Sequence, residues 1–119
     1  MKMKIVISGL LLSLLLSGVL VFSQEKASKL EKVIIKTSAV CQQCKDRLEK
    51  NIAFEKGVRA VSLDLETKEL TVEFRTGKNT KEGLKKAVTK VGYDADELEA
   101  DPKAYEKLPA CCKKDAPPH

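Results

Sequence analysis

Apolar and polar residues alternate in three short stretches of this chain, a pattern typical of β-strands that bury one face. The stretches cover residues 32–36, 61–65 and 70–74. Only the short turn Glu66–Glu69 separates the last two, so we expect them to pair as an antiparallel hairpin.

Two other stretches place apolar residues three and four positions apart, which is typical of amphipathic helices. The first runs from Lys45 to Phe54, and the second is built on residues 84–91. Gly57 and Gly92 follow them, and glycine accepts the left-handed backbone that often ends a helix. We therefore expect each helix to stop at its glycine.

The flanks of the second helix complete the order of elements. Asn79, with Glu82 three residues later, resembles a capping box. Tyr93–Glu99 is a candidate for a weak edge strand, and Asp101-Pro102 predicts the start of a short further helix. The order is that of a ferredoxin-like βαββαβ sandwich, an α+β fold whose antiparallel sheet carries both helices on one face.

The first residues have a different character. Met1–Lys4 is basic, Ile5–Phe22 is apolar apart from Ser and Gly, and the small residue Ser23 follows. This predicts a signal peptide over residues 1–23, with an uncleaved anchor helix as the alternative. We therefore expect a secreted or periplasmic protein that has no membrane association after cleavage.

The charged residues exclude one class of partner. The chain has 22 Lys and Arg against 17 Asp and Glu, a net charge of +5, and the two signs are interspersed. It has no Trp. Nucleic-acid binding favours a clustered basic stripe with stacking aromatic residues, so we expect no nucleic-acid partner.

Cys41 and Cys44 lie where the first strand gives way to the first helix, and two thiols at such a corner can reach one soft ion. The free N–H groups and the dipole of a helix start favour the thiolate, which is the form that binds metal. Lys45 is expected to lower the thiol pKa further, with a solvated helix position as the alternative. Two sulfurs suit Cu(I) or Hg(II), whereas structural zinc takes four ligands.

Cys111 and Cys112 form a second pair, and adjacent cysteines rarely bridge each other. Three interpretations remain open. The pair folds back toward Cys41 and Cys44 and enlarges the metal site, forms disulfides with them, or captures metal independently on a mobile tail. We favour a role connected with the metal.

Several of these features together resemble the heavy-metal-associated domain family. This family includes copper chaperones, metal-binding domains of copper-transporting ATPases and the periplasmic mercury-binding protein. The resemblance rests on the cysteine corner, the helix behind it, the hairpin and Gly92-Tyr93, and it covers about Glu31–Asp96. It implies that Cys41 and Cys44 are the metal ligands and that Tyr93 lies near their loop.

The resemblance also divides the chain, into a heavy-metal-associated domain over residues 31–98 and a C-terminal extension over residues 99–119. In the extension we expect a short helix, the cysteine pair and a disordered tail. The family commonly has Gly-Met-Thr-Cys where this chain has Ser38-Ala39-Val40-Cys41. We therefore expect the loop to differ in rigidity and metal preference.

The predicted function is an exported, non-enzymatic protein that captures and transfers a soft metal ion by thiolate exchange. Cu(I) is favoured, with Hg(II) or Zn(II) as alternatives. The expected partner is a metal-transporting ATPase, an efflux protein or another metal-binding protein that docks transiently. One alternative is a thiol–disulfide oxidoreductase, although Val40 stands where thioredoxin-like sites usually have an aromatic residue. The other is a structural module in which all four cysteines form disulfides.

Overall fold

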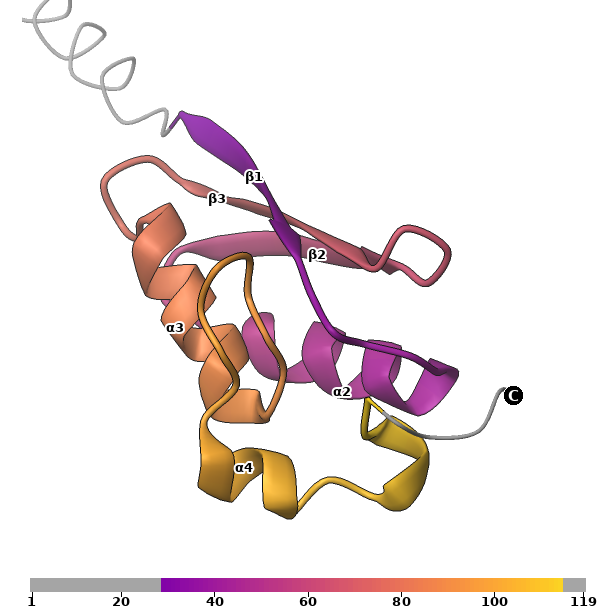
Figure 1. Cartoon of the computed structure of the whole chain (residues 1–119). Helices are drawn as coiled ribbons and strands as arrows, with labels where there is room; N and C mark the ends of the chain where they lie inside the picture. The colour runs from indigo at the N-terminus through magenta and orange to yellow at the C-terminus, as the bar shows by residue number, and fades with distance from the viewer. Residues whose placement is uncertain (1–28, 115–119) are drawn as a thin grey trace, which may run out of the picture.

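The domain is built on one antiparallel sheet of three strands, seen in the computed structural model, which describes residues 29–114 (Figure 1). The strands are β1 (Leu30–Lys36), β2 (Val58–Asp64) and β3 (Glu69–Arg75). β3 lies in the middle and pairs with both neighbours, and β2 and β3 form the predicted hairpin. The predicted signal peptide and residues 115–119 of the predicted disordered tail lie outside the described residues.

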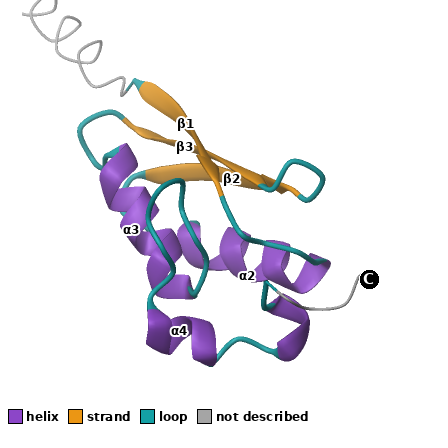
Figure 2. Ribbon diagram, viewed as in Figure 1, coloured by secondary structure: helices purple, strands orange, loops and turns teal. Residues whose placement is uncertain are grey.

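Helices α2 (Gln42–Ile52) and α3 (Lys81–Val91) lie on the same face of this sheet, as the ferredoxin-like fold predicts (Figure 1). The C-terminal extension adds α4 (Pro102–Glu106) and a 3₁₀ turn at Ala110–Cys112. Figure 2 shows it running from the end of α3 back to the start of α2. Within residues 29–114, no helix is both long enough and apolar enough to cross a bilayer.

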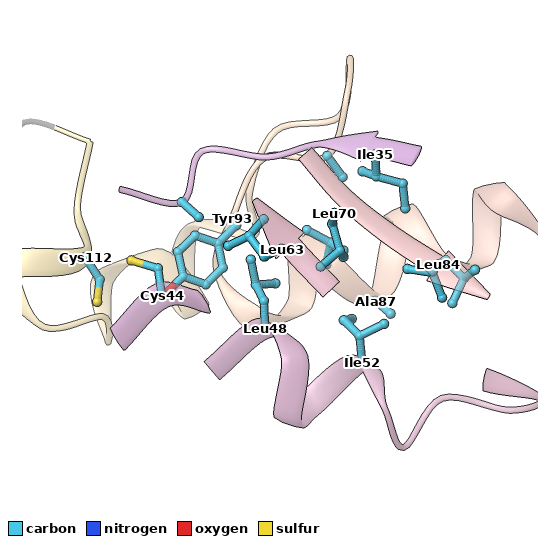
Figure 3. Close-up of a cluster of buried hydrophobic side chains, with 14 of the residues drawn as sticks. Ile35, Cys44, Leu48, Ile52, Leu63, Leu70, Leu84, Ala87, Tyr93 and Cys112 are labelled. Carbon is cyan, nitrogen blue, oxygen red and sulfur yellow. The ribbon is translucent and has the colours of Figure 1, made fainter. Parts of the chain in front are cut away.

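The core lies between the sheet and the two helices. Nine large apolar residues of the strands and helices are at most 1% exposed. They are Ile35, Leu48, Ile52, Leu63, Leu70, Val72, Phe74, Leu84 and Val88. Figure 3 shows Cys44 and Cys112 at one end of this cluster, beside the ring of Tyr93. Cys44 and Cys112 are therefore held against a packed interior.

The predicted bounds of the first helix are wrong at both ends. α2 begins at Gln42 with Cys41 as its N-cap residue, so Cys44 lies in its first turn. The helix ends at Ile52, and Gly57 takes its positive φ of 77° in the turn that enters β2. Gly57 therefore shapes the turn into the strand, and it does not end the helix.

The cap of α3 also lies one residue later than predicted. Thr80 is the N-cap, and its hydroxyl accepts a hydrogen bond from the Gly83 N–H at 3.0 Å. Asn79 instead accepts from the backbone N–H of Thr80, and the carboxylate of Glu82 pairs with Lys85. The other end of α3 agrees with the prediction, because Gly92 follows it with a φ of 121°.

The predicted edge strand at Tyr93–Glu99 does not form in the described part of the chain. Ala95 makes only isolated bridges, one to Thr37 and one to Leu98. Next to it, Asp96 adopts a positive φ of 52°, and its side chain accepts the backbone N–H of Lys36 at 2.8 Å. A carboxylate thus takes the place of a strand carbonyl at this edge of β1, and the chain turns away.

Candidate metal centre

The loop between β1 and α2 is held on both sides. The Thr37 hydroxyl donates to the carbonyl of Lys68 at 2.9 Å and accepts from the N–H of Ala39 at 3.2 Å. The Ser38 hydroxyl accepts from the N–H of Asp94 at 2.9 Å. Ala39 is fully buried under the loop. These contacts fix the backbone that carries the first cysteine.

Cys41 and Cys44 lie side by side, with their sulfurs 3.3 Å apart. Cys44 is fully buried and Cys41 is 8% exposed. Burial raises the pKa of Cys41 to about 12, outweighing the lowering effect of the Cys44 backbone. The helix start thus lowers this thiol pKa as expected, but burial raises it by more, so an incoming ion must displace the proton of Cys41.

The C-terminal cysteines join this pair. The Cys112 sulfur lies 3.6 Å from that of Cys41, and the Cys111 sulfur lies 3.9 Å from that of Cys112. All four cysteines are thiols. The sulfurs of Cys41, Cys111 and Cys112 all lie within 4.8 Å of one another. The second pair therefore folds back toward the first, as both the enlarged metal site and the disulfide interpretation require, and it does not lie apart on a separate tail.

Arg47 connects the two parts of the site. Its Nη1 donates to the Tyr93 hydroxyl at 2.9 Å and to the Cys112 sulfur at 3.2 Å. Burial alone would raise the pKa of Cys112, but the hydrogen bonds from Arg47 and from the neighbouring thiols lower it to about 7. Cys112 therefore ionises more readily than Cys41 and Cys111, whose pKa values burial raises.

Sequence reasoning missed Arg47, although its spacing carries a signal. Residues three apart on a helix share a face, so Arg47 had to lie beside Cys44 on α2. Lys45 instead lies 3.9 Å from Glu49, and its side chain is one-third exposed. We expected Lys45 to place a cation against a thiol. In the described contacts, Arg47 does this instead.

Tyr93 lies near the metal loop, where the family resemblance places it. Its side chain is fully buried, and burial raises the pKa of its hydroxyl. The hydroxyl accepts the hydrogen bond from Arg47, so it orients the guanidinium that reaches Cys112. Tyr93 therefore supports the site without lying on its open side.

The open side is a surface hollow of about 320 Å³. It is lined by Cys41, Gln42, Gln43 and Cys111. The thiol of Cys111 donates to the side-chain oxygen of Gln43 at 3.2 Å across this hollow. An ion or a partner's thiolate that enters here meets Cys41 and Cys111 directly.

A buried corner of paired thiols on this α+β fold is the arrangement of a soft-metal-binding domain. The chain belongs to the heavy-metal-associated domain family, which matches residues 33–94 and confirms the resemblance and the fold. The copper chaperone CopZ of Staphylococcus epidermidis is 30% identical over 64 residues, 54% of this chain and 94% of CopZ.

Two solved structures show the same likeness. Oxidised MerP from Ralstonia metallidurans is 26% identical, with a TM-score of 0.54 over 57% of this chain and 96% of MerP. The Cu(I)-loaded N-terminal domain of a potential copper-translocating P-type ATPase from Bacillus subtilis is 28% identical. Its TM-score is 0.53 over 57% of this chain and 86% of that domain. The relatives are thus metallochaperones and metal-binding domains.

The family match includes Cys41 and Cys44 but ends at residue 94. Cys111 and Cys112 lie beyond it, on the extension that the structure brings back to the site. Family membership therefore accounts for the first pair of cysteines and leaves the second pair to be explained by this chain's own geometry.

Proposed function

We propose that this protein is an exported carrier of a soft metal ion, with Cu(I) as its main cargo, bound by Cys41 and Cys44. The observation that carries the proposal is the 3.3 Å separation of the two sulfurs in the family's metal loop. Thiolates select soft ions such as Cu(I) over hard ions such as Mg²⁺. Hg(II) and Zn(II) are the competing cargoes, and export rests on the N-terminal sequence.

Transfer would proceed by ligand exchange through the surface hollow beside Cys41. A partner's thiolate attacks the bound ion, a three-coordinate intermediate forms, and a bond to Cys41 or Cys44 then breaks. The metal keeps its oxidation state throughout, so the protein acts as a carrier and not as an enzyme. The 8% exposure of Cys41, against full burial of Cys44, favours Cys41 as the ligand that meets the partner.

The proposed partner is an acidic metal-binding domain of a transporting ATPase or an efflux protein. Two hollows that share Arg47 carry more basic than acidic residues, which would attract such a surface. Their other basic residues are Lys50, Lys90, Lys103 and Lys107, against Asp46 and Asp101. The likeness to the Cu(I)-loaded N-terminal domain of a potential copper-translocating ATPase supports this choice of partner.

Native mass spectrometry of the reduced full chain tests the proposal, with Cu(I), Zn(II) and Hg(II) offered in competition without oxygen. We expect one Cu(I) per chain in the parent and none in Cys41→Ser/Cys44→Ser. Ala110→Ser is the matched control, because it adds a hydroxyl near the site and removes no thiol. A parent that binds none of the three ions would refute the proposal and return the cysteines to redox or structural roles.

A further inference from the structure

Three sulfurs, and not two, surround the outer end of the metal loop. With metal–sulfur bonds of about 2.3 Å, ligand sulfurs lie about 4.0 Å apart in a trigonal site and about 4.6 Å apart in a linear one. The Cys41–Cys112 and Cys111–Cys112 sulfur separations are 3.6 and 3.9 Å. These distances fit a three-coordinate centre better than a linear one.

Several contacts hold the extension in this position. Cys112 is 1% exposed and accepts the hydrogen bond from Arg47. Lys114 forms an ion pair with Asp94 at 2.8 Å, and its backbone N–H donates to the Tyr105 hydroxyl at 3.0 Å. The second cysteine pair is thus docked on the domain by side chains on either side of it.

We propose that Cys41, Cys111 and Cys112 form a three-thiolate centre for one soft ion, next to the Cys41/Cys44 pair. This inference rests on the proposed function and deepens it, because Cys41 belongs to both ligand sets. The centre takes ions that accept three thiolates, with Cu(I) as the first probe. The extension then acts as a retaining arm over the family's two-cysteine site.

The shared ligand gives the ion a route between the two sets. While the ion stays bound to Cys41, a bond to the Cys44 sulfur forms, and the bonds to Cys112 and then Cys111 break. The Cys44 thiol gives its proton to the first sulfur that is released, and the second takes a proton from solvent. No oxidant or reductant is needed, because the metal only exchanges ligands. The ion ends on the pair that the family uses for transfer.

The guanidinium of Arg47 suits this centre. Three thiolates around Cu(I) carry a net charge of −2, and a buried negative charge is costly unless a cation pairs with it. Arg47 supplies that cation 3.2 Å from Cys112. Because its other hydrogen bond goes to Tyr93, the cation is fixed in place before any ion arrives.

X-ray absorption of the Cu(I)-loaded, reduced full chain tests the centre by counting the sulfur ligands. We expect three sulfurs in the parent, in the Ala110→Ser control and in Cys44→Ser. In Cys111→Ser/Cys112→Ser we expect one Cu(I) bound by two sulfurs. Competition with a Cu(I) chelator should show at least about tenfold weaker retention in this double variant, since even outer-shell changes cost about 10- to 100-fold.

Alkylation of the parent gives a readout that needs no variant. Cys111 is partly exposed, so it should react in the metal-free chain and become protected by one equivalent of Cu(I).

Two sulfurs in the parent, or unchanged retention in Cys111→Ser/Cys112→Ser, would overturn the three-thiolate centre while the two-cysteine carrier stands. A parent that binds no Cu(I) would instead refute the carrier itself.

Discussion

Replacing Arg47 with Gln tests how the domain holds its C-terminal arm. In the parent, the pKa of Cys112 is about 7, against an ordinary value of 9.0. Without the guanidinium, the thiolate fraction at about pH 7 should fall from about one half toward about one in a hundred. The difference corresponds to at most about 2.7 kcal/mol, and the lost hydrogen bond to Tyr93 adds about 1 kcal/mol that does not depend on pH.

The sign of the pH dependence follows from where the proton is bound. Cys112 binds its proton more weakly in the folded chain, so its contribution to stability is complete above about pH 9 and is lost as the pH falls through about 7. The contribution of Cys41 to stability has the opposite pH dependence, because its pKa is raised in the folded chain. This contribution is complete below about pH 9 and is lost as the pH rises toward about 12. Comparing variants at one pH cancels most of the Cys41 contribution.

The assay is urea unfolding of the metal-free, reduced chain at about pH 6 and about pH 9. Arg47→Gln should lower the free energy of unfolding more at the higher pH, by up to about 2.7 kcal/mol. Lys50→Gln removes the same charge from an exposed position of α2 and should show no such difference. Equal losses at both pH values, or the same pH effect in Lys50→Gln, would refute the assigned role of Arg47.

Three further substitutions probe the support of the site. Gly92→Ala should destabilise the chain by more than about 1 kcal/mol in urea, because the φ of 121° disfavours a side chain and the new Cβ would lie 3.2 Å from Leu108. Thr80→Ala should cost about 1 kcal/mol in the same assay by removing the cap of α3, while Cu(I) retention stays unchanged. Glu97→Gln should lower the urea midpoint at about pH 7, because it removes the nearer of the two carboxylate partners of the buried Lys85 ammonium. Its effect should shrink as the pH falls through the pKa of Glu97, which Lys85 lowers, because the parent carboxylate is then protonated as well.

The fold could be predicted from this sequence because its signals are periodic and local. Alternation in the strands and helical spacing in α2 and α3 each report which side of an element is buried. The wrong predictions of strands and helix ends lie where a side chain, and not the backbone, makes the hydrogen bond. Asp96 accepts the N–H of Lys36, so an expected strand became a turn. Thr80 and Asn79 are both good caps, and the spacing of Asn79 from Glu82 favoured the wrong one.

At the site, the sequence indicated the cysteines but not their grouping. The C-x-x-C spacing is local, so a helix start is enough to bring Cys41 and Cys44 together. Cys112 reaches Cys41 across 71 positions of sequence, through the path of the extension around α3 and α4. No short-range sequence pattern encodes that path. The three interpretations of Cys111 and Cys112 therefore stayed open until the structure was known.

The two halves of the site are supported by different contacts, which makes their roles separable. Thr37 and Ser38 fix the loop that carries Cys41, and neither of these contacts involves the extension. Arg47 instead reaches outward from α2 to Cys112, with Tyr93 behind it. Weakening Arg47 should therefore loosen the hold on Cys112, while Lys114 still ties the extension to Asp94, and leave the Cys41/Cys44 pair in place. A site built in this way can hold an ion with three sulfurs and still present it to a partner on two.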